Sequence, residues 1–567
     1  MSVRLPDHLD LIAAAPAGIQ KLRGLILELA VRGKLVPQDP NDQPASELLK
    51  RIAKKRTRLE AGATRKKIEQ TPLFNPREWP FESPIGWEWE RFGEIAEIER
   101  GGSPRPIKSF LTDDPDGLNW IKIGDTDIGG KYITSTSEKI RREGLTKTRM
   151  VYPGDFLLTN SMSFGRPYIT QIEGCIHDGW LRISPPNSLD KDYLYTLLSS
   201  PFVRKLFVIA AAGAVVMNLN ADKVRELPIP LPPLAEQRRI VAKVDELMAL
   251  CDRLEAEQED AGAAHARLVT TLLGTLTQSA DGADLAANWQ RLAGHFDILF
   301  TTEASLDSLK QTILQLAVMG KLVPQDPNDE PASELLRRIT KERARLEEEG
   351  VCKKSKPLQP ISLGDLPFEL PHGWAWARFP EVGQFGRGKS KHRPRNDPSL
   401  FKPGIYPLVQ TGEVARADTI VREYHSKYSE VGLSQSKMWP RGTLCITIAA
   451  NIADSAILGF DACFPDSVVG LVPSQLIGDG RYFLWFMKTA RGELLRFAPS
   501  TAQKNINLEI LESVRIPLPP STEMSRIVAK VDELLALLDR LKAELADSRA
   551  RQERLAAALI ESALQAA

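Results

Sequence analysis

The chain has 567 residues, of which 43% are hydrophobic and 26% are charged, and its formal net charge is +1. This length predicts several domains, and the composition excludes a disordered or fibrous protein. Because the net charge is near zero, binding to nucleic acid would have to depend on local basic patches.

The first segment, residues 1–85, is predicted to be helical. Its apolar stripe at helical spacing consists of Ile19, Leu22, Ile26 and Leu29. Gly33 predicts the end of one helix, and the Pro44-Ala-Ser-Glu sequence predicts the start of another.

Residues 86–228, which we call the first variable domain, contain short apolar or alternating runs. These runs predict strands at 117–125, 131–134, 154–159 and 181–185. Gly, Pro, Asp and Asn separate them, and a helix is predicted near 192–207. We therefore predict an α/β domain with a mixed, strand-rich core.

Residues 229–372 are predicted to be helical again. Consecutive prolines in PLPP, from Pro230 to Pro233, require an extended entry to the next helix. Apolar residues then follow in steps of 4, 3, 4 and 3, at Ile240, Val244, Leu247, Cys251 and Leu254. This spacing predicts a coiled-coil helix of about 35–40 residues, roughly 55 Å long. The alternative is that the stripe is only the core of a compact helical domain.

The whole pattern occurs twice. LAVRGKLVPQDPNDQPASELLKRI begins at Leu29 and LAVMGKLVPQDPNDEPASELLRRI at Leu316, an offset of 316 − 29 = 287 residues. The same offset relates Trp87 to Trp374, and it predicts a second variable domain at 373–515 and a helical segment at 516–567. In the second variable domain, strands are predicted at 404–413, 442–449 and 468–473, with a helix near 481–497.

The helical segments are nearly identical in the two halves, whereas the variable domains share hardly any extended identity. We therefore predict a multidomain α+β fold with an internal pseudo-two-fold duplication. Its two α/β variable domains would be separated by long antiparallel coiled-coil helices.

These motifs, in this order, resemble the specificity subunits of type I restriction-modification systems, and the resemblance covers the whole chain. The motifs are GKLVPQDPND and PLPPLAEQRRIV in the helical segments, with GEIAEIERGGSP (93–104), NWIKIGD (119–125), VYPGDFLLTNSMSFGR (151–166) and MNLNADKVRELPIPLPP (217–233). The second variable domain has TIAANIAD (447–454) where the first has TNSMSFGR, as expected if the two domains read different bases.

The resemblance implies a DNA-recognition subunit with no catalytic activity, in which each variable domain reads one half of an asymmetric bipartite site. It also implies three partners: double-stranded DNA, two DNA adenine methyltransferase subunits and ATP-dependent restriction endonuclease subunits. S-adenosylmethionine, ATP and Mg would be bound by those partners, so this chain is expected to bind no cofactor and no metal. Because no run of 18 apolar residues and no N-terminal signal occurs, we expect a cytoplasmic protein without a membrane segment.

Basic residues in both variable domains are candidates for phosphate contacts, since a DNA reader needs cations on phosphates and polar side chains on base edges. In the first domain they are Arg100, Arg105, Lys108, Arg141, Arg142, Lys147 and Arg149. In the second domain they alternate in RGKSKHRPR as Arg387, Lys389, Lys391, Arg393 and Arg395. The alternative is that these are solvated basic loops.

Polar residues after a predicted strand are candidates for base contacts. In the first domain they are Asn160, Ser161, Ser163 and Arg166, and the weaker analogues in the second domain are Gln410, Thr411 and Asn451. The alternative is a plain turn. Asn218 and Asn220 recur as Asn505 and Asn507, so we interpret these four residues as helix caps or structural hydrogen bonders and not as discriminating residues.

Enzyme motifs are not supported by their context. Residues 383–390 match the phosphate-loop pattern GxxxxGKS, but Pro394 and Pro398 follow, and a phosphate loop requires a helix there. Asp113, Asp114 and Asp116 indicate a turn and not a metal site. Five cysteines occur singly, which predicts reduced thiols and no zinc site. The competing non-enzymatic hypothesis is a coiled-coil scaffold whose two variable domains bind proteins or small molecules.

Overall fold

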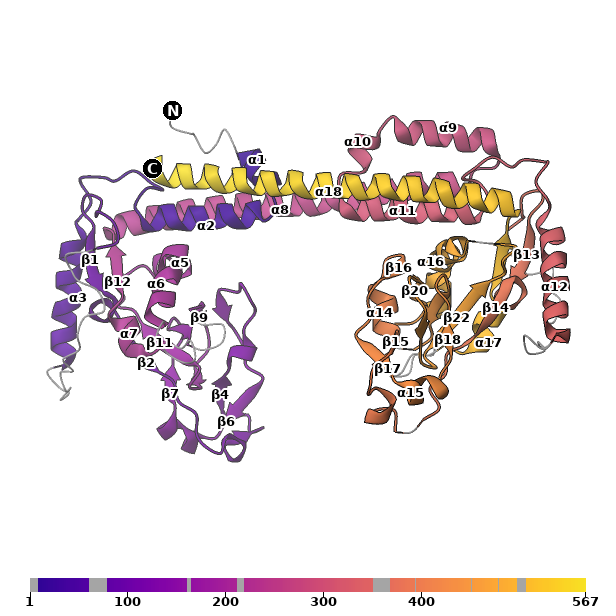
Figure 1. Cartoon of the computed structure of the whole chain (residues 1–567). Helices are drawn as coiled ribbons and strands as arrows, with labels where there is room; N and C mark the ends of the chain where they lie inside the picture. Colours follow the sequence, from indigo (N-terminus) through magenta and orange to yellow (C-terminus); the bar gives the residue numbers. More distant parts are fainter. Residues whose placement is uncertain are drawn as a thin grey trace. The chain divides into compact units, whose positions relative to one another are not determined.

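The computed structural model of the chain describes residues 9–60, 79–160, 165–211, 219–349, 368–392, 394–449, 451–477, 479–496 and 506–566. The chain forms two compact units (Figure 1). The first unit is Met1–Ala261 with Ser548–Ala567, and the second is Gly262–Asp547. Two helices contribute residues to both units: α8 (Leu234–Thr277, 44 residues) and α18 (Ser521–Ala566, 46 residues). Both are longer than the 35–40 residues that the apolar spacing predicts.

Outside its variable domain, the first unit contains α1 (Leu9–Ala14), α2 (Gly18–Val31) and α3 (Ala45–Glu60), with parts of α8 and α18. The stripe on α2 is buried at Ile19, Leu22 and Ile26, in one core with Ile240 and Ala556 from the two long helices. Ion pairs line the same contact, from Arg23 to Asp252 (2.6 Å) and Glu255 (2.9 Å) and from Lys21 to Glu553 (3.0 Å). The predicted stripes therefore pack against each other in a three-helix arrangement.

The first variable domain contains two five-stranded sheets. One has the order β2 (Glu97–Arg100), β11 (Trp180–Ser184), β8 (Phe156–Thr159), β9 (Pro167–Thr170), β5 (Tyr132–Ile133). The other has the order β3 (Leu111–Thr112), β6 (Glu138–Ile140), β4 (Leu118–Ile121), β10 (Gly174–Ile176), β7 (Arg149–Val151). Neighbours are antiparallel except β5 with β9 and β4 with β10, so the sheets are mixed as predicted.

Four helices complete this domain: α4 (Phe92–Ile95), α5 (Lys191–Ser199), α6 (Pro201–Ala211) and α7 (Ala221–Arg225). The single helix predicted near 192–207 is instead two helices, because Pro201 has no N–H to continue the hydrogen bonding of α5. Among the described residues, no single helix is long and apolar enough to span a membrane. Among the described residues, the α5–α6 pair has the length and apolar composition of a span when the two helices are taken together, but it is bent by 63°. It contributes buried residues such as Leu197 and Phe207 to the core of the unit.

The second unit contains α9 (Gly282–Ala293), α10 (Phe296–Leu299), α11 (Glu303–Val318) and α12 (Ala332–Glu348), with parts of α8 and α18. Its first sheet has the order β14 (Gly383–Arg387), β22 (Val468–Pro473), β19 (Leu444–Thr447), β20 (Ser455–Leu458), β16 (Ile420–Val421). Its second has the order β17 (Ser426–Tyr428), β15 (Tyr406–Leu408), β21 (Ala462–Cys463), β18 (Met438–Trp439). The remaining helices are α13 (Phe379–Val382), α14 (Thr411–Arg416), α15 (Glu430–Ser434), α16 (Arg481–Arg496) and α17 (Leu508–Ser513).

The five-stranded sheet that begins with β2 and the one that begins with β14 have the same topology, because their strands occupy the same order in the sheet and along the chain. The two variable domains therefore share a fold although their sequences differ, and the α+β prediction with internal duplication is confirmed. Some predicted strands are shorter in the structure, since 404–413 contains only β15 and 117–125 only β4. The strand predicted at 468–473 is confirmed with the same bounds as β22.

Each variable domain is joined to its long helix by the same buried contact. β1 (Glu88–Arg91) pairs with β12 (Pro228–Leu231), and β13 (Ala375–Arg378) pairs with β23 (Arg515–Leu518). Next to the first pair, the Trp87 Nε1–H donates to Glu236 Oε2 at 3.0 Å, and Gln38 Nε2 donates to Glu236 Oε1 at 3.2 Å. Burial raises the pKa of Glu236, while these two donors oppose the shift. Trp374, Gln325 and Glu523 repeat the contact with the same distances.

Candidate nucleic-acid interface

The predicted cations of the first variable domain lie on neighbouring elements. Arg100 ends β2, Arg105 and Lys108 follow in the next loop and its 3-10 helix (Ile107–Ser109), and all three are exposed. The second cluster consists of Arg141, Arg142, Lys147 and Arg149, which are exposed on or beside the 3-10 helix Arg142–Lys147 and β7.

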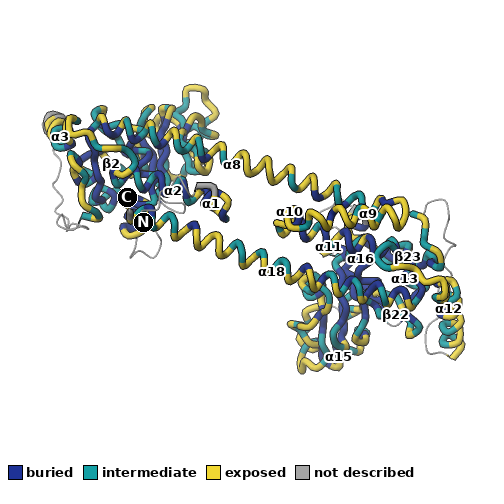
Figure 2. Tube along the Cα trace, turned by 90° about the horizontal axis from the view of Figure 1, so that it is seen from above, coloured by how far each residue is buried: buried dark blue, intermediate teal, exposed yellow. Residues whose placement is uncertain are grey.

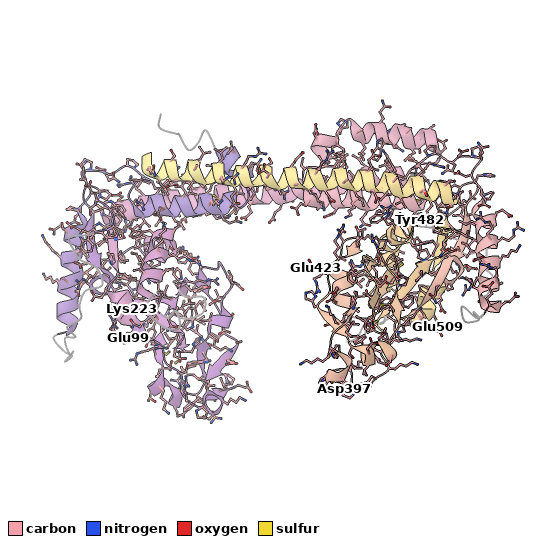
Figure 3. The ribbon with its side chains drawn as sticks, in the orientation of Figure 1. Glu99, Lys223, Asp397, Glu423, Tyr482 and Glu509 are labelled. Atoms are coloured by element: carbon pink, nitrogen blue, oxygen red, sulfur yellow. The ribbon has the colours of Figure 1, made fainter. Side chains whose placement is uncertain are left out.

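The structure brings these two clusters together. Lys147 Nζ lies 5.5 Å from the centre of the Phe110 ring, in the loop that carries Lys108. Arg149 Nε lies 3.6 Å from Glu99 Oε1, on the strand that carries Arg100 (Glu99 is labelled in Figure 3). Two stretches that are about forty residues apart in sequence therefore form one basic surface, which we call the first basic surface.

Asp178, which sequence reasoning did not identify, organises part of this surface. Its main-chain carbonyl accepts a hydrogen bond from Arg100 Nε (3.2 Å), and its carboxylate accepts one from Ser103 Oγ (2.7 Å). Arg105 Nη2 lies 3.7 Å from the same carboxylate. The Ser103 hydrogen bond is the largest cause of the lowered pKa of Asp178. No sequence signal marks this residue, because Arg100, Ser103 and Arg105 are more than 70 positions away.

The four candidates for base contacts in the first domain differ in position. Asn160 is only 1% exposed, and its Nδ2 donates to the carbonyl of Asp178 at 2.8 Å, the same oxygen that Arg100 uses. Arg166 is half-buried in the turn before β9, and its main-chain N–H donates to Thr159 Oγ1. Ser161 and Ser163 lie outside the described residues. Asn160 is therefore buried beneath the basic surface, where it binds the carbonyl to which Arg100 donates.

In the second variable domain, the alternating cations that the structure describes lie at the end of a strand and in the loop that follows it. Arg387 ends β14 and is exposed, Lys389 and Lys391 are exposed in the loop that follows, and Arg393 lies outside the described residues. Arg395 contacts both carboxylate oxygens of Asp466, at 3.1 and 2.9 Å. The second basic surface consists of Arg387, Lys389, Lys391 and Arg395. The last three lie on a loop, as the glycine and prolines in the sequence indicate.

Residues 435–436 fix this loop in place. Gln435 Oε1 accepts hydrogen bonds from the main-chain N–H groups of Lys391 (2.7 Å) and His392 (3.1 Å). Ser436 Oγ donates to the carbonyl of Lys389 at 3.0 Å. Asp397 accepts from Ser399 and His392, which lowers the pKa of its carboxyl to about 2 (Figure 3). The cations are thus presented by an anchored loop.

Lys437 is a further cation of the second basic surface that sequence reasoning missed. Its Nζ lies 3.6 Å from the ring centre of Trp439 and the side chain is half-buried. Burial is the main cause of its lowered pKa, and repulsion by Lys389 adds to it. The 287-residue offset makes Gly102 of the first domain the equivalent of Lys389. The sheet registers pair Met438 with Cys463 and Arg149 with Ile176, which stands 287 residues before Cys463, so Thr148 is the equivalent of Lys437. This pair of lysines therefore distinguishes the second surface from the first.

The weaker candidates of the second domain lie at element ends. Gln410 is exposed at the N-cap of α14, and Thr411 is half-buried as the first residue of that helix. Asn451 is exposed in the loop between β19 and β20, which corresponds to the loop between β8 and β9 in the first domain. The interpretation of the repeated asparagines is confirmed for Asn220 and Asn507, whose side chains cap α7 and α17, while Asn218 and Asn505 lie outside the described residues.

The GxxxxGKS match contains a strand, since residues 383–387 form β14, and the next helical residues are the single 3-10 turn Pro398–Leu400. Asp114 Oδ1 accepts the main-chain N–H of Asp116 at 3.0 Å, which is the hydrogen bond of a turn. Within the described ranges, no group of three or more His, Cys, Asp or Glu side chains is arranged to hold a metal ion.

Comparisons with known proteins identify the family of this chain. The family model for the type I restriction modification DNA specificity domain matches residues 84–261 and 371–547. The specificity subunits of the type I restriction enzymes EcoAI and EcoEI from Escherichia coli are 36% and 37% identical to this chain, with 96% of this chain and 94% of each relative covered. A solved chain, reported under complex assembly and conformational transition of the type I R-M system, is 21% identical, with 86% of this chain and 99% of that chain covered and a TM-score of 0.48. The chain therefore belongs to the specificity subunits of type I restriction-modification enzymes, which recognise DNA and are not themselves catalytic.

Proposed function

We propose that this chain recognises an asymmetric, bipartite DNA site, with one half read by each variable domain, and that it directs methyltransferase and endonuclease subunits to that site. The observation that carries the proposal is that the two variable domains share a fold but have different side chains on their basic surfaces. The two five-stranded sheets follow the same order, but Lys389 and Lys437 stand where the first domain has Gly102 and Thr148. Equal scaffolds with different side chains are suited to reading two different half-sites.

We expect an exchange of residues 373–515 for the equivalent block of a relative with another target to change one half of the recognised site. The other half stays the same, because the first variable domain keeps its own core and its own basic surface. Sequencing of methylated positions in cells that carry the exchanged chain with its methyltransferase measures both halves. The reciprocal exchange of residues 86–228 is the control. A change in both halves after either exchange contradicts modular reading.

The long helices support binding of two copies of one partner. Leu268 on α8 is 50% exposed, and Leu555 on α18, which stands 287 residues later, is 48% exposed. Each residue from 256 to 264 of α8 is exposed as well (Figure 2). Large apolar side chains at equivalent positions of a duplicated helix are suited to equivalent contacts with another protein. We assign these contacts to two methyltransferase subunits, and the helices between the variable domains would set the gap between the half-sites.

Leu268→Glu and Leu555→Glu are each expected to remove one methyltransferase subunit from the complex, because a carboxylate cannot be buried in an apolar contact without a large desolvation cost. Native mass spectrometry of the complex of the full chain with its methyltransferase gives the stoichiometry, and the double variant is expected to bind no methyltransferase. Val431→Glu is the matched control, since Val431 is 49% exposed in the second variable domain. Unchanged stoichiometry in the double variant contradicts this assignment.

We also propose that the chemistry of the complex belongs to these partners. S-adenosylmethionine would then be bound by the methyltransferase subunits, and ATP and Mg by the endonuclease subunits. The strand at residues 383–387 supports this division, because it occupies the segment that would have to be a phosphate-binding loop.

A further inference from the structure

The two variable domains each hold an arginine at the same position by the same hydrogen bond. Arg100 ends β2 and Arg387 ends β14, and the two residues are 287 positions apart. Arg100 Nε donates to the main-chain carbonyl of Asp178, and Arg387 Nε donates to the main-chain carbonyl of Asp466. Both arginines pair across the sheet with equivalent strands, β11 and β22.

The glycine after each arginine shows that the end of the strand lies close to the loop that contains the aspartate. A Cβ built on Gly101 would overlap the carbonyl oxygen of His177, and one built on Gly388 would overlap the carbonyl oxygens of Phe464 and Pro465. These carbonyls belong to the residues just before Asp178 and Asp466. The Arg-Gly pair therefore lets the end of the strand lie directly against the loop that anchors the guanidinium.

The carboxylate of each aspartate fixes that loop. Asp178 accepts from Ser103 Oγ at 2.7 Å, and Ser103 Oγ also accepts the main-chain N–H of Asp178 at 3.3 Å. Asp466 is held instead by Arg395, through both carboxylate oxygens. The partners differ between the domains, but the result is the same, because the carbonyl that accepts from the arginine is held at a defined place.

A guanidinium carries five N–H donors, and the anchor uses only the one on Nε. In the part of the chain that the structure describes, the four donors on the two Nη atoms of Arg100 and Arg387 make no hydrogen bond, and both side chains are exposed and held at Nε. A planar pair of NH2 groups matches two oxygens of a phosphate. We propose that Arg100 and Arg387 are equivalent phosphate-binding residues, one in each variable domain, and that Asp178 and Asp466 are positioning residues that hold them. This assignment rests on the proposed function as a DNA reader.

The duplication explains why these arginines contact phosphate and not bases. Two domains that read different half-sites need different base contacts, whereas the DNA backbone is the same in both halves. A residue with the same identity, strand position and anchor in both domains is suited to the common feature of the ligand. Lys389 and Lys437 have no lysine counterpart in the first domain, so a phosphate contact that they make belongs to the second domain alone.

Arg100→Ala and Arg387→Ala test the phosphate contact in the full chain. The probes are a duplex that carries the target mapped by methylation and a duplex in which the target bases are scrambled. Each variant is expected to bind both duplexes about tenfold more weakly, so the ratio of the two affinities stays unchanged. Each variant is also expected to lower the slope of log K against log salt by about 1. Arg337→Ala on α12, where Arg337 pairs with Glu334 at 2.6 Å, is the matched control and is expected to change neither value.

Two results overturn the assignment: an unchanged affinity, or a loss confined to the target duplex together with relaxed preference at one base. A wild-type chain that does not distinguish the target from the scrambled duplex contradicts the proposed function instead, so the two failures are distinguishable.

Asp178→Ala and Asp466→Ala test the positioning role. Removal of a negative charge by itself strengthens attraction to DNA, so weaker binding is the result that positioning predicts. We expect about a threefold to tenfold loss for Asp178→Ala and no further loss when it is combined with Arg100→Ala. Stronger binding, or additive losses in the double variant, overturns the positioning role. Ser103→Ala keeps the charge and removes the bond that fixes the loop, so the same loss is expected even if Asp178→Ala lowers the folding stability.

Discussion

Raising the salt concentration from about 50 mM to about 200 mM is expected to weaken binding of this chain to duplex DNA by about 10³-fold to 10⁵-fold. The physical reason is the release of counterions when cations neutralise phosphates. The chain has a net charge of only +1, so the effect must come from its two basic surfaces. They are formed by Arg100, Arg105, Lys108, Arg141, Arg142, Lys147 and Arg149, and by Arg387, Lys389, Lys391, Arg395 and Lys437. Fluorescence anisotropy with a labelled duplex over this salt range gives the slope.

A triple substitution of Lys389, Lys391 and Lys437 by alanine is expected to lower that slope by about 2 to 3, at about 0.9 for each phosphate contact. The matched control replaces Arg337, Arg338 and Arg345 of α12 by alanine. It removes the same charge from the same unit, but these arginines pair with Glu334, Glu330 and Glu342. If both triple variants lower the salt slope equally, the slope depends on the net charge of the chain and not on contacts of these three lysines. A slope near zero for the wild-type chain favours the scaffold hypothesis, in which the variable domains bind proteins.

Gly388→Ala is expected to destabilise the second unit by about 3 kcal/mol or more, because the methyl group enters a closed space. A Cβ at Gly388 would overlap two carbonyl oxygens and lie 2.6 Å from the Phe464 ring. The oxygens are main-chain atoms, so the clash requires movement of β14 or of the loop at 464–466. Thermal unfolding is expected to show a transition lowered by several degrees for this unit.

Gly386→Ala is the control on the same strand, where the added Cβ meets nothing within 4 Å. This variant is expected to change stability by less than about 1 kcal/mol, since only the entropy of the unfolded chain is affected. Gly101→Ala repeats the test in the first unit, because a Cβ there would overlap the carbonyl oxygen of His177. A Gly388→Ala protein that is as stable as Gly386→Ala contradicts the close approach of strand and loop.

Local patterns in the sequence predicted several features of the fold. The apolar steps at Ile240 and Val244 place the buried face of α8, and Asn220 and Asn507 cap the helices that follow them. These features depend on residues a few positions apart. The length of some strands was overestimated because the apolar runs continue into buried loops, as at Val409 and Ile448, which are buried outside any strand.

The contacts that organise the candidate interface were not predictable in this way. Arg100 meets Asp178 across 78 positions because β2 pairs with β11, and Lys389 comes near Lys437 across 48 positions because the loop after β14 is bonded to residues 435–436. Short-range sequence patterns identify the charged residues, but they do not identify partners that lie many positions away in the chain. Asn160 illustrates the same point, since its position after a strand suggested an exposed side chain, and the structure buries it against Asp178.

The amino-acid sequence by itself determined the duplication, the alternation of helical segments with unlike domains and the family, because repeats and helix periodicity are properties of residue order. Only the tertiary structure decided which cations share a surface and which carbonyls and carboxylates hold them. The reason is that sheet pairing joins residues far apart in the chain, and the energy of those contacts depends on distance in space and not on separation along the sequence.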